Sequence, residues 1–249
     1  MERQRLRRGA LFTSFALFQA FKVFHLFFSP VLLLMASAAG VAGGTVIVYA
    51  SLVVSTLVLG RAFCGWVCPG CGVQELVALK VRRPVRRRGA DRVKWVVAAA
   101  LFGAATVVAV RAGGLHSVDP FFGMRHATVM QGLLLFFGHL VIIAGLALAL
   151  GRWGSCHAIC WIAPLLIVGT RVARAGGWPM LHLEAEPAEC FACGACDDGC
   201  PMSLPVSQMV GRGTMWNAEC LLCGSCVDGC PSNAIRFSFA RARRPALSP

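Results

Sequence analysis

The sequence is poor in charged residues, and acidic residues are the scarcest of them. Only 14% of the 249 residues are charged, and 11 Asp and Glu stand against 24 Lys and Arg. The resulting net charge of +13 would suit a nucleic-acid binder. Such proteins, however, carry their basic charge on a polar fold, whereas here the Lys and Arg residues lie between apolar blocks. We therefore predict no nucleic-acid partner.

Long apolar blocks make up most of the chain. Hydrophobic residues account for 57% of the sequence, and the mean hydropathy is +0.68. A helix that spans a bilayer needs about 20 mainly apolar residues. Four blocks meet this length, at about residues 11–39, 45–63, 93–110 and 133–150. The sequence thus predicts an all-α transmembrane four-helix bundle over residues 1–180, with the lipid bilayer as its solvent. A shorter stretch, residues 161–168, is expected to form an interfacial or re-entrant helix.

The positions of Lys and Arg predict the orientation of these spans. Basic residues precede the first block, lie between the second and third, and follow the fourth. Loops rich in Lys and Arg stay in the cytoplasm. We therefore expect a multi-pass protein of the inner (cytoplasmic) membrane with both termini and its metal sites on the cytoplasmic side. The first apolar run lacks a small-residue cleavage site, so we read it as a retained anchor.

Eight of the 13 cysteines form a tandem motif. Cys190-x2-Cys193-x2-Cys196-x3-Cys200-Pro is repeated 30 residues later from Cys220. In two-cluster ferredoxins the three closely spaced cysteines bind one [4Fe–4S] cluster and the fourth binds the other. Zinc is the alternative for paired cysteines, but tandem runs of this kind favour iron. The predicted ligand sets are Cys190, Cys193, Cys196 and Cys230 for cluster 1, and Cys220, Cys223, Cys226 and Cys200 for cluster 2.

The composition changes at residue 181, where acids appear and long apolar runs end. We predict an α+β two-cluster ferredoxin-like domain over residues 181–240 and a tail over residues 241–249. Such a module conducts electrons and has no substrate pocket of its own. Free cysteine ligands also indicate a reducing compartment.

Two further cysteine pairs stand at the ends of the second and fourth blocks. Each is a Cys-x3-Cys pair, which places both thiols on one face of a helix. The pairs are Cys64 with Cys68 and Cys156 with Cys160. They predict a third iron–sulfur cluster or another thiophilic metal at the membrane boundary; the alternative is thiols that serve only in packing. Cys71 adds the spacing of radical-SAM enzymes, but no length remains for their barrel.

Several ionisable residues in or near the apolar blocks are candidates for quinone contact or proton transfer. Oxidation of a quinol releases protons, so its site needs an acceptor beside an apolar slot. Lys22 is better explained by snorkelling to the interface, and a solvated loop is the alternative for the residues between the third and fourth blocks. The candidates are His25, His116, Asp119, His126 and His139.

The segment GRAFCGWVCPGCGVQE, the second Cys-x3-Cys pair and the tandem motif together resemble the membrane-bound ferredoxin-type 4Fe–4S proteins. These include the quinol dehydrogenase membrane component of periplasmic nitrate reductase systems (NapH) and the C-terminal half of NosR. The resemblance covers residues 45–235 and implies four spans, cytoplasmic clusters and electron exchange with the quinol pool. One departure is Trp161, which follows Cys160 where the family usually has Pro.

These observations predict a membrane-anchored iron–sulfur protein that relays electrons between the quinone/quinol pool and a partner redox protein. It would be an electron-transfer subunit of a quinol-linked oxidoreductase rather than a complete enzyme. The alternative function is an assembly or maturation factor that supplies electrons for metal insertion or for activation of a reductase. A redox sensor is the third possibility, although no output domain is visible.

Overall fold

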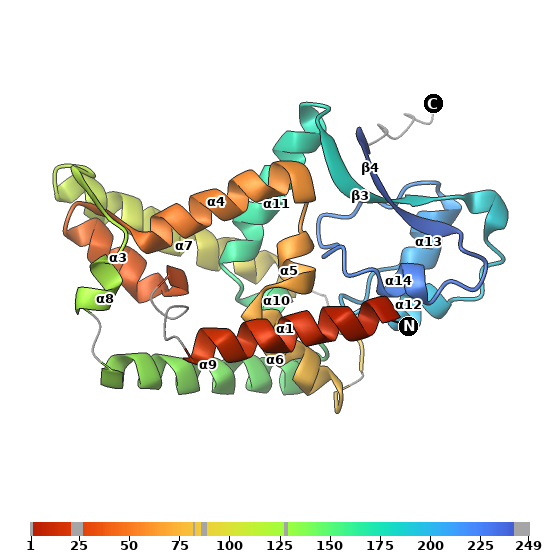
Figure 1. The fold of residues 1–249 in the computed structure, drawn as a ribbon, viewed down its shortest axis with the longest axis horizontal. Coiled ribbons are helices and arrows are strands. Elements are labelled where there is room, and N and C mark those ends of the chain that lie inside the picture. The colour runs from red at the N-terminus through yellow and green to blue at the C-terminus, as the bar shows by residue number, and fades with distance from the viewer. Residues whose placement is uncertain (1, 21–26, 82, 86–88, 127–128, 242–249) are drawn as a thin grey trace.

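The computed structural model describes residues 2–20, 27–81, 83–85, 89–126 and 129–241. Figure 1 shows an elongated molecule with α3, α4, α7 and α8 at one end and a two-stranded sheet with short helices at the other. The helices are α1 Glu2–Ala20, α3 Pro30–Ala38, α4 Gly44–Leu59, α5 Ala62–Trp66, α6 Pro69–Ala78, α7 Ala90–Arg111, α8 Phe122–His126, α9 Val129–Leu150, α10 Gly154–Ala158, α11 Ile162–Ala175, α12 Ala195–Gly199, α13 Val206–Gly211 and α14 Ser225–Asp228.

The first apolar block is not one helix. It contains the end of α1 and the whole of α3, and residues 21–26 between them lie outside the described residues. Pro30 opens α3 because proline has no backbone N–H and fits only the first turn of a helix. Ser29 caps this helix, and its Oγ accepts a hydrogen bond from the backbone N–H of Leu32 at 3.4 Å.

The second apolar block is interrupted near its C-terminal end. Helix α4 stops at Leu59, and Gly60 follows with φ +57°, a conformation that glycine adopts most easily. The chain then turns into α5 and α6, which carry the first cysteine pair. With its 16 residues, α4 is about 24 Å long, which is shorter than the roughly 30 Å apolar core of a bilayer.

The predicted transmembrane four-helix bundle is therefore wrong. Among the described residues, one helix, Asp91–Arg111, has the length and apolar composition needed to cross a membrane. Two shorter apolar helices are Gly44–Leu59 and Phe137–Leu150. The observed fold is a mixed arrangement of helices with two small sheets. The spans were predicted from apolar composition alone. In the structure, Pro30 at the start of α3 and Gly60 with its positive φ divide the helices.

The stretch expected to be interfacial or re-entrant lies in α11, a packed helix. Leu166 and Ile167 are fully buried, and α11 packs along α4. The two helices approach so closely at Gly169 that a Cβ there would clash with Thr56 Oγ1. Helix α11 thus belongs to the core.

Two small sheets complete the fold. Strand β1, Val41–Gly43, pairs in parallel with β2, Ser117–Asp119. Strand β3, Pro179–Ala185, pairs antiparallel with β4, Ile235–Arg241, and the register sets Leu183 opposite Phe237. Strands β3 and β4 flank α12, α13 and α14 in sequence, so the C-terminal part fits a ferredoxin-like domain. Of the predicted tail, Arg241 ends β4 and residues 242–249 lie outside the described residues.

Candidate metal centres

The tandem cysteine motif is repeated in the backbone conformation. Positive φ angles recur at an offset of 30 residues, so each cysteine loop has the same path as its copy. Gly194 and Gly224 hold φ +78° and +74°, and each precedes a short helix, α12 or α14. The other matched pairs are Ala192 with Leu222 and Ser203 with Asn233.

Cys190, Cys193, Cys196 and Cys230 line one small cavity. The first three come from the first loop and α12, and Cys230 comes from the end of the second repeat. Among all 13 cysteines, Cys193 alone is exposed. The cavity therefore reaches close to solvent.

Cys200, Cys220, Cys223 and Cys226 line a second cavity, walled by Leu183, Met202 and Met215 among others. The backbone N–H of Leu204 donates a hydrogen bond to Cys200 Sγ at 3.4 Å. Backbone donors of this kind stabilise the charge of metal-bound sulfur. The structure thus brings together the two sets of four that the spacing predicts.

The donor chemistry of both cavities fits [4Fe–4S] clusters. All 13 cysteines are free, so no disulfide competes for the sulfurs. Burial raises the pKa of Cys220 to about 12, so this thiol keeps its proton unless a cation replaces it. Burial alone would also raise the pKa of Cys230, but hydrogen bonds from Ser232 and backbone N–H groups outweigh it and lower the pKa. Four sulfur ligands around each cavity match what a cubane cluster requires.

The cysteines of the two Cys-x3-Cys pairs, called the boundary cysteines below, surround a third, larger cavity, which is called the boundary cavity. It has a volume of about 360 Å³, lies among α5, α6, α9 and α10, and is lined mostly by apolar side chains. Five cysteines line it rather than the four predicted: Cys64, Cys68, Cys71, Cys156 and Cys160. Sequence reasoning set Cys71 aside, although its spacing of two residues from Cys68 was the signal that it belonged to the group.

The quinone and proton candidates fall at three different places. His139 lines the boundary cavity, and its ring lies 5.7 Å from that of Trp161. His116 and Asp119 lie at the β1–β2 end, where Asp119 accepts a hydrogen bond from Phe121 N and pairs with Arg125 at 3.4 Å. His126 ends α8, and His25 lies outside the described residues. Of the described candidates, only His139 is brought to the cysteines.

The boundary cavity and the cavity of Cys220 share a lining residue. The buried Leu221 lines both of them. Helix α5 packs against the loop that contains Leu221, and Trp66 Nε1 donates a hydrogen bond to Leu222 O at 3.0 Å. A Cβ on Gly65 would clash with Leu221 O and would lie 3.3 Å from Cys223 Cα. The boundary site and the ferredoxin module are therefore in direct contact.

Buried charges connect the same two sites. Lys94 Nζ lies 2.5 Å from Glu219 Oε2 and 3.3 Å from Asp91 Oδ1. Arg61 pairs with Glu219 at 3.3 Å, and His157 Nδ1 lies 2.6 Å from Asp91 Oδ1. The ligand atoms of Asp91, His157 and Glu219 lie within 4.8 Å of one another. Lys94 and Arg61 together balance the charges of the two carboxylates, so this network holds the elements together by ion pairs.

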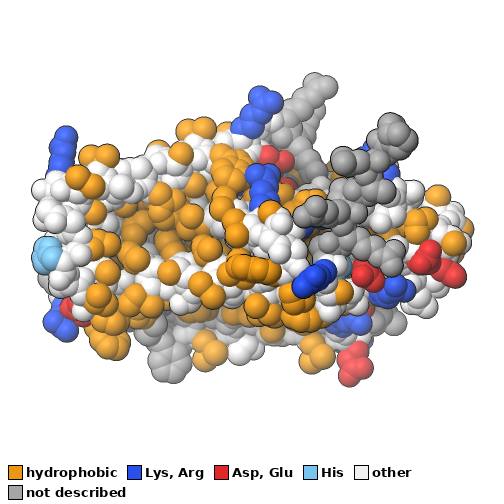
Figure 2. Space-filling view, turned by 90° about the horizontal axis from the view of Figure 1, so that it is seen from above, with side chains coloured by type: hydrophobic (Ala, Val, Ile, Leu, Met, Phe, Trp, Pro, Cys, Tyr) orange, Lys and Arg blue, Asp and Glu red, His pale blue; other side chains and the backbone are white. Residues whose placement is uncertain are grey.

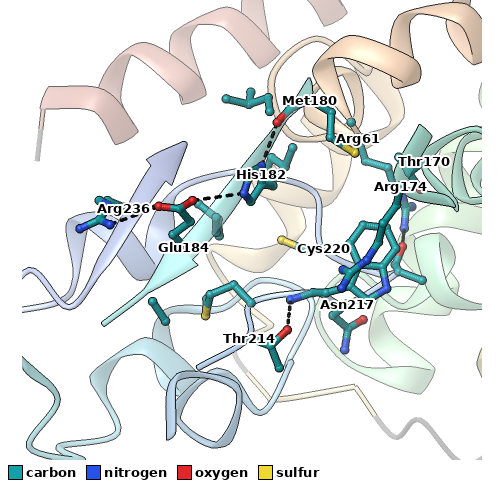
Figure 3. A pocket seen from close by; sticks show the side chains of 18 of the residues that line it. Arg61, Thr170, Arg174, Met180, His182, Glu184, Thr214, Asn217, Cys220 and Arg236 are labelled. Atoms are coloured by element: carbon teal, nitrogen blue, oxygen red, sulfur yellow. Dashed lines mark hydrogen bonds and ion pairs between the residues drawn. The ribbon is translucent and has the colours of Figure 1, made fainter. Parts of the chain in front are cut away.

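Another cavity opens beside Cys220. It has a volume of about 150 Å³ and lies between β3, α11 and residues 213–218. Figure 3 shows Cys220 between the strand that carries His182 and Glu184 and the loop that carries Thr214 and Asn217. Within the lining of this cavity, the guanidinium group of Arg174 stacks over the ring of Trp216 at 4.4 Å. The second set of cysteines thus has a polar, partly open flank in addition to its apolar wall.

Comparison with known families agrees with these metal centres. A 4Fe–4S binding domain matches residues 41–88, and a 4Fe–4S dicluster domain matches residues 188–235. No curated protein and no solved structure gives a significant match. The two matches support an iron–sulfur protein of ferredoxin-like type. Its two 4Fe–4S domains give it a role in electron transfer.

Proposed function

We propose that the chain is a membrane-anchored electron carrier that takes electrons from quinol and passes them through three clusters to a partner redox protein. The observation that carries this proposal is the shared wall at Leu221, which lines both the boundary cavity and the cavity of Cys220. The ferredoxin module is therefore not a separate unit on a flexible tether. A cluster in the boundary cavity and a cluster in the cavity of Cys220 would therefore be neighbours, as electron exchange between them requires.

The third cluster belongs to the boundary cavity. The match to a 4Fe–4S binding domain over residues 41–88 includes Cys64, Cys68 and Cys71. Cys156 and Cys160 reach the same cavity from α10 and the residues after it. Burial raises the pKa of Cys64 to about 12 despite the nearby Arg61, so a metal would have to supply the positive charge that holds a thiolate there. When bound, a cluster there accepts and releases one electron at a time.

The same cavity supports the quinol half of the proposal. Its lining is mainly apolar, with Phe15, Phe28 and Phe63 beside the cysteines. His139 stands in this lining as a proton acceptor within reach of a bound ring. Trp161 Nε1 donates to the Tyr49 hydroxyl at 2.8 Å, which orients the indole next to His139. The likeness to the quinol dehydrogenase membrane components favours the same substrate class.

Membrane anchoring is supported by the apolar surface of α4, α7 and α9. Large side chains on all three are exposed, among them Val54 at 62%, Val110 at 70% and Val141 at 71%. On the face seen in Figure 2, hydrophobic side chains cover much of the end built from α3, α4 and α7. An apolar surface of this extent needs lipid or protein to cover it. We propose lipid, with α7 as the helix that crosses the bilayer.

Electrons would leave through cluster 1. The exposed Cys193 and Phe191, which is 64% exposed, lie at its cavity. Glu186, Glu189 and Asp198 are exposed nearby in sequence and form no ion pair within the described part of the chain. A local negative surface on a basic protein steers a cationic partner to this edge.

A charge reversal tests this exit. Glu189→Lys is expected to slow electron transfer to a basic c-type cytochrome by up to about tenfold at low ionic strength. The difference should shrink at high salt because exposed charges are screened. Ser117→Lys adds charge at the opposite end and should have little effect. Equal rates for the two variants under stopped-flow conditions would exclude this edge as the exit.

The central test is the iron content combined with reduction by quinol. Anaerobically purified chain should hold about twelve irons, and Cys160→Ala about eight, because one cluster loses a ligand. A quinol analogue in membranes should reduce the clusters of the wild-type chain. It should fail in Cys160→Ala, whereas dithionite should still reduce the two remaining clusters. Reduction by quinol at an unchanged rate in that variant would remove the boundary site from the path.

A further inference from the structure

Cys71 differs from the boundary cysteines in its neighbours. It is 3% exposed, and its Sγ lies 3.8 Å from Cys156 Sγ. Cys156 belongs to the second of the predicted Cys-x3-Cys pairs. Cys71 therefore touches a sulfur of that pair.

The other four sulfurs come from the two matched Cys-x3-Cys pairs, and all four line the cavity. These four supply the number of thiolates that one cubane needs. A fifth thiol in contact with one of them has another role available, as a hydrogen-bond donor to sulfur.

Gln74 provides a second donor at the same sulfur. It lies one turn after Cys71 on α6 and is fully buried. Its Nε2 points at Cys156 Sγ at 3.9 Å. A thiolate can only accept hydrogen bonds, so the amide nitrogen is the group suited to face it. Two side chains from α6 thus approach Cys156.

We propose that Cys71 is not a ligand of the boundary cluster but a positioning residue that, together with Gln74, donates a hydrogen bond to the ligand sulfur of Cys156. This inference rests on the proposed function, because it requires a cluster in the boundary cavity. Reduction adds negative charge to the cluster and its sulfurs, and a donor stabilises that charge. The two donors therefore raise the reduction potential of the boundary cluster. A higher potential favours its reduction by quinol.

The test compares Cys71→Ala, Cys71→Ser and Cys64→Ala in the full chain, purified anaerobically in detergent. Iron and acid-labile sulfide are measured first. Wild type and both Cys71 variants should hold about twelve irons, and Cys64→Ala about eight. Redox titration followed by EPR then gives the potential of the boundary cluster. It should be more negative in Cys71→Ala and close to wild type in Cys71→Ser, whose hydroxyl can still donate.

Each contrary result has a distinct meaning. If Cys71→Ala holds about eight irons and Cys64→Ala about twelve, Cys71 is a ligand and the inference is wrong. If Cys71→Ala keeps its iron and its potential, the donor role is wrong while the proposed function stands. Gln74→Leu, which removes the other donor, gives an independent reading of the potential should Cys71→Ala fail to fold. About eight irons in the wild type would refute the third cluster itself, and the inference with it.

Discussion

Gly65→Ala is expected to slow electron flow from the boundary site to the ferredoxin module strongly. Helix α5 touches the loop of cluster 2 at this residue, and an added Cβ would clash with Leu221 O and crowd Cys223. Both contacts are to backbone atoms, which cannot rotate away. Forced overpacking of this kind costs about 1–3 kcal/mol, and the simplest relief is separation of the two sites. A quinol analogue should then reduce the ferredoxin clusters far more slowly, as followed by their visible absorbance.

Gly103→Ala is the matched control for this variant. Gly103 lies in α7, and a Cβ there would meet nothing within 4 Å. Alanine is also the better helix former by about 1 kcal/mol, so this variant should behave like wild type. Dithionite should reduce the clusters of both variants fully, which shows that they are present. Normal reduction by quinol in Gly65→Ala would mean that electrons do not pass at the contact of α5 with Leu221.

The grouping of the ferredoxin cysteines followed from the sequence because it depends on local spacing. A tight loop with cysteines at x2 intervals directs three sulfurs to one point, and the 30-residue repeat supplies the fourth from the other copy. The cavities of Cys190 and of Cys220 have the membership that this reasoning gives. Helix α7 was also predictable from the sequence, because its apolar run has no interior proline.

The arrangement of the helices could not be predicted in the same way. Apolar composition does not tell a helix that crosses a bilayer from one that packs in a core, and α11 is the second kind. Ser29 and Pro30 start a new helix inside what looked like one span. The approach of Cys71 to Cys156 joins residues 85 positions apart. Such contacts depend on tertiary packing, which no local pattern encodes.

The roles of the basic residues likewise depend on tertiary packing and could not be predicted from local sequence. Positive charge at the N-terminus and between the second and third apolar blocks predicts orientation toward the cytoplasm. Arg7 and Lys94, however, are 1% and 0% exposed and pair with acidic residues inside the protein. These two cations therefore serve packing between segments, and the remaining exposed ones carry the argument for orientation.

Arg7→Met is expected to lower stability strongly, because Arg7 links the boundary site to the ferredoxin module. Its Nη2 lies 3.0 Å from Glu75 Oε2, and the two side chains are only 2% and 7% exposed. Its Nε donates to Gln4 Oε1 at 2.8 Å, and Gln4 in turn donates to Cys223 O at 3.1 Å. Helix α1 thus connects α6, which carries Cys71, to the loop of cluster 2.

Removal of one partner from a buried ion pair costs about 3–5 kcal/mol, and the lower end applies here because Arg8 also pairs with Glu75. The midpoint of thermal unfolding in detergent should fall by on the order of 10 °C. Arg8→Met is the matched control: Arg8 contacts the same carboxylate at 2.9 Å but is 52% exposed, so its loss should cost less than about 1 kcal/mol. Equal effects of the two substitutions would show that burial of Arg7 contributes nothing. The expected difference follows from solvation, since water compensates the lost pair at Arg8 and cannot reach the carboxylate oxygen that faces Arg7.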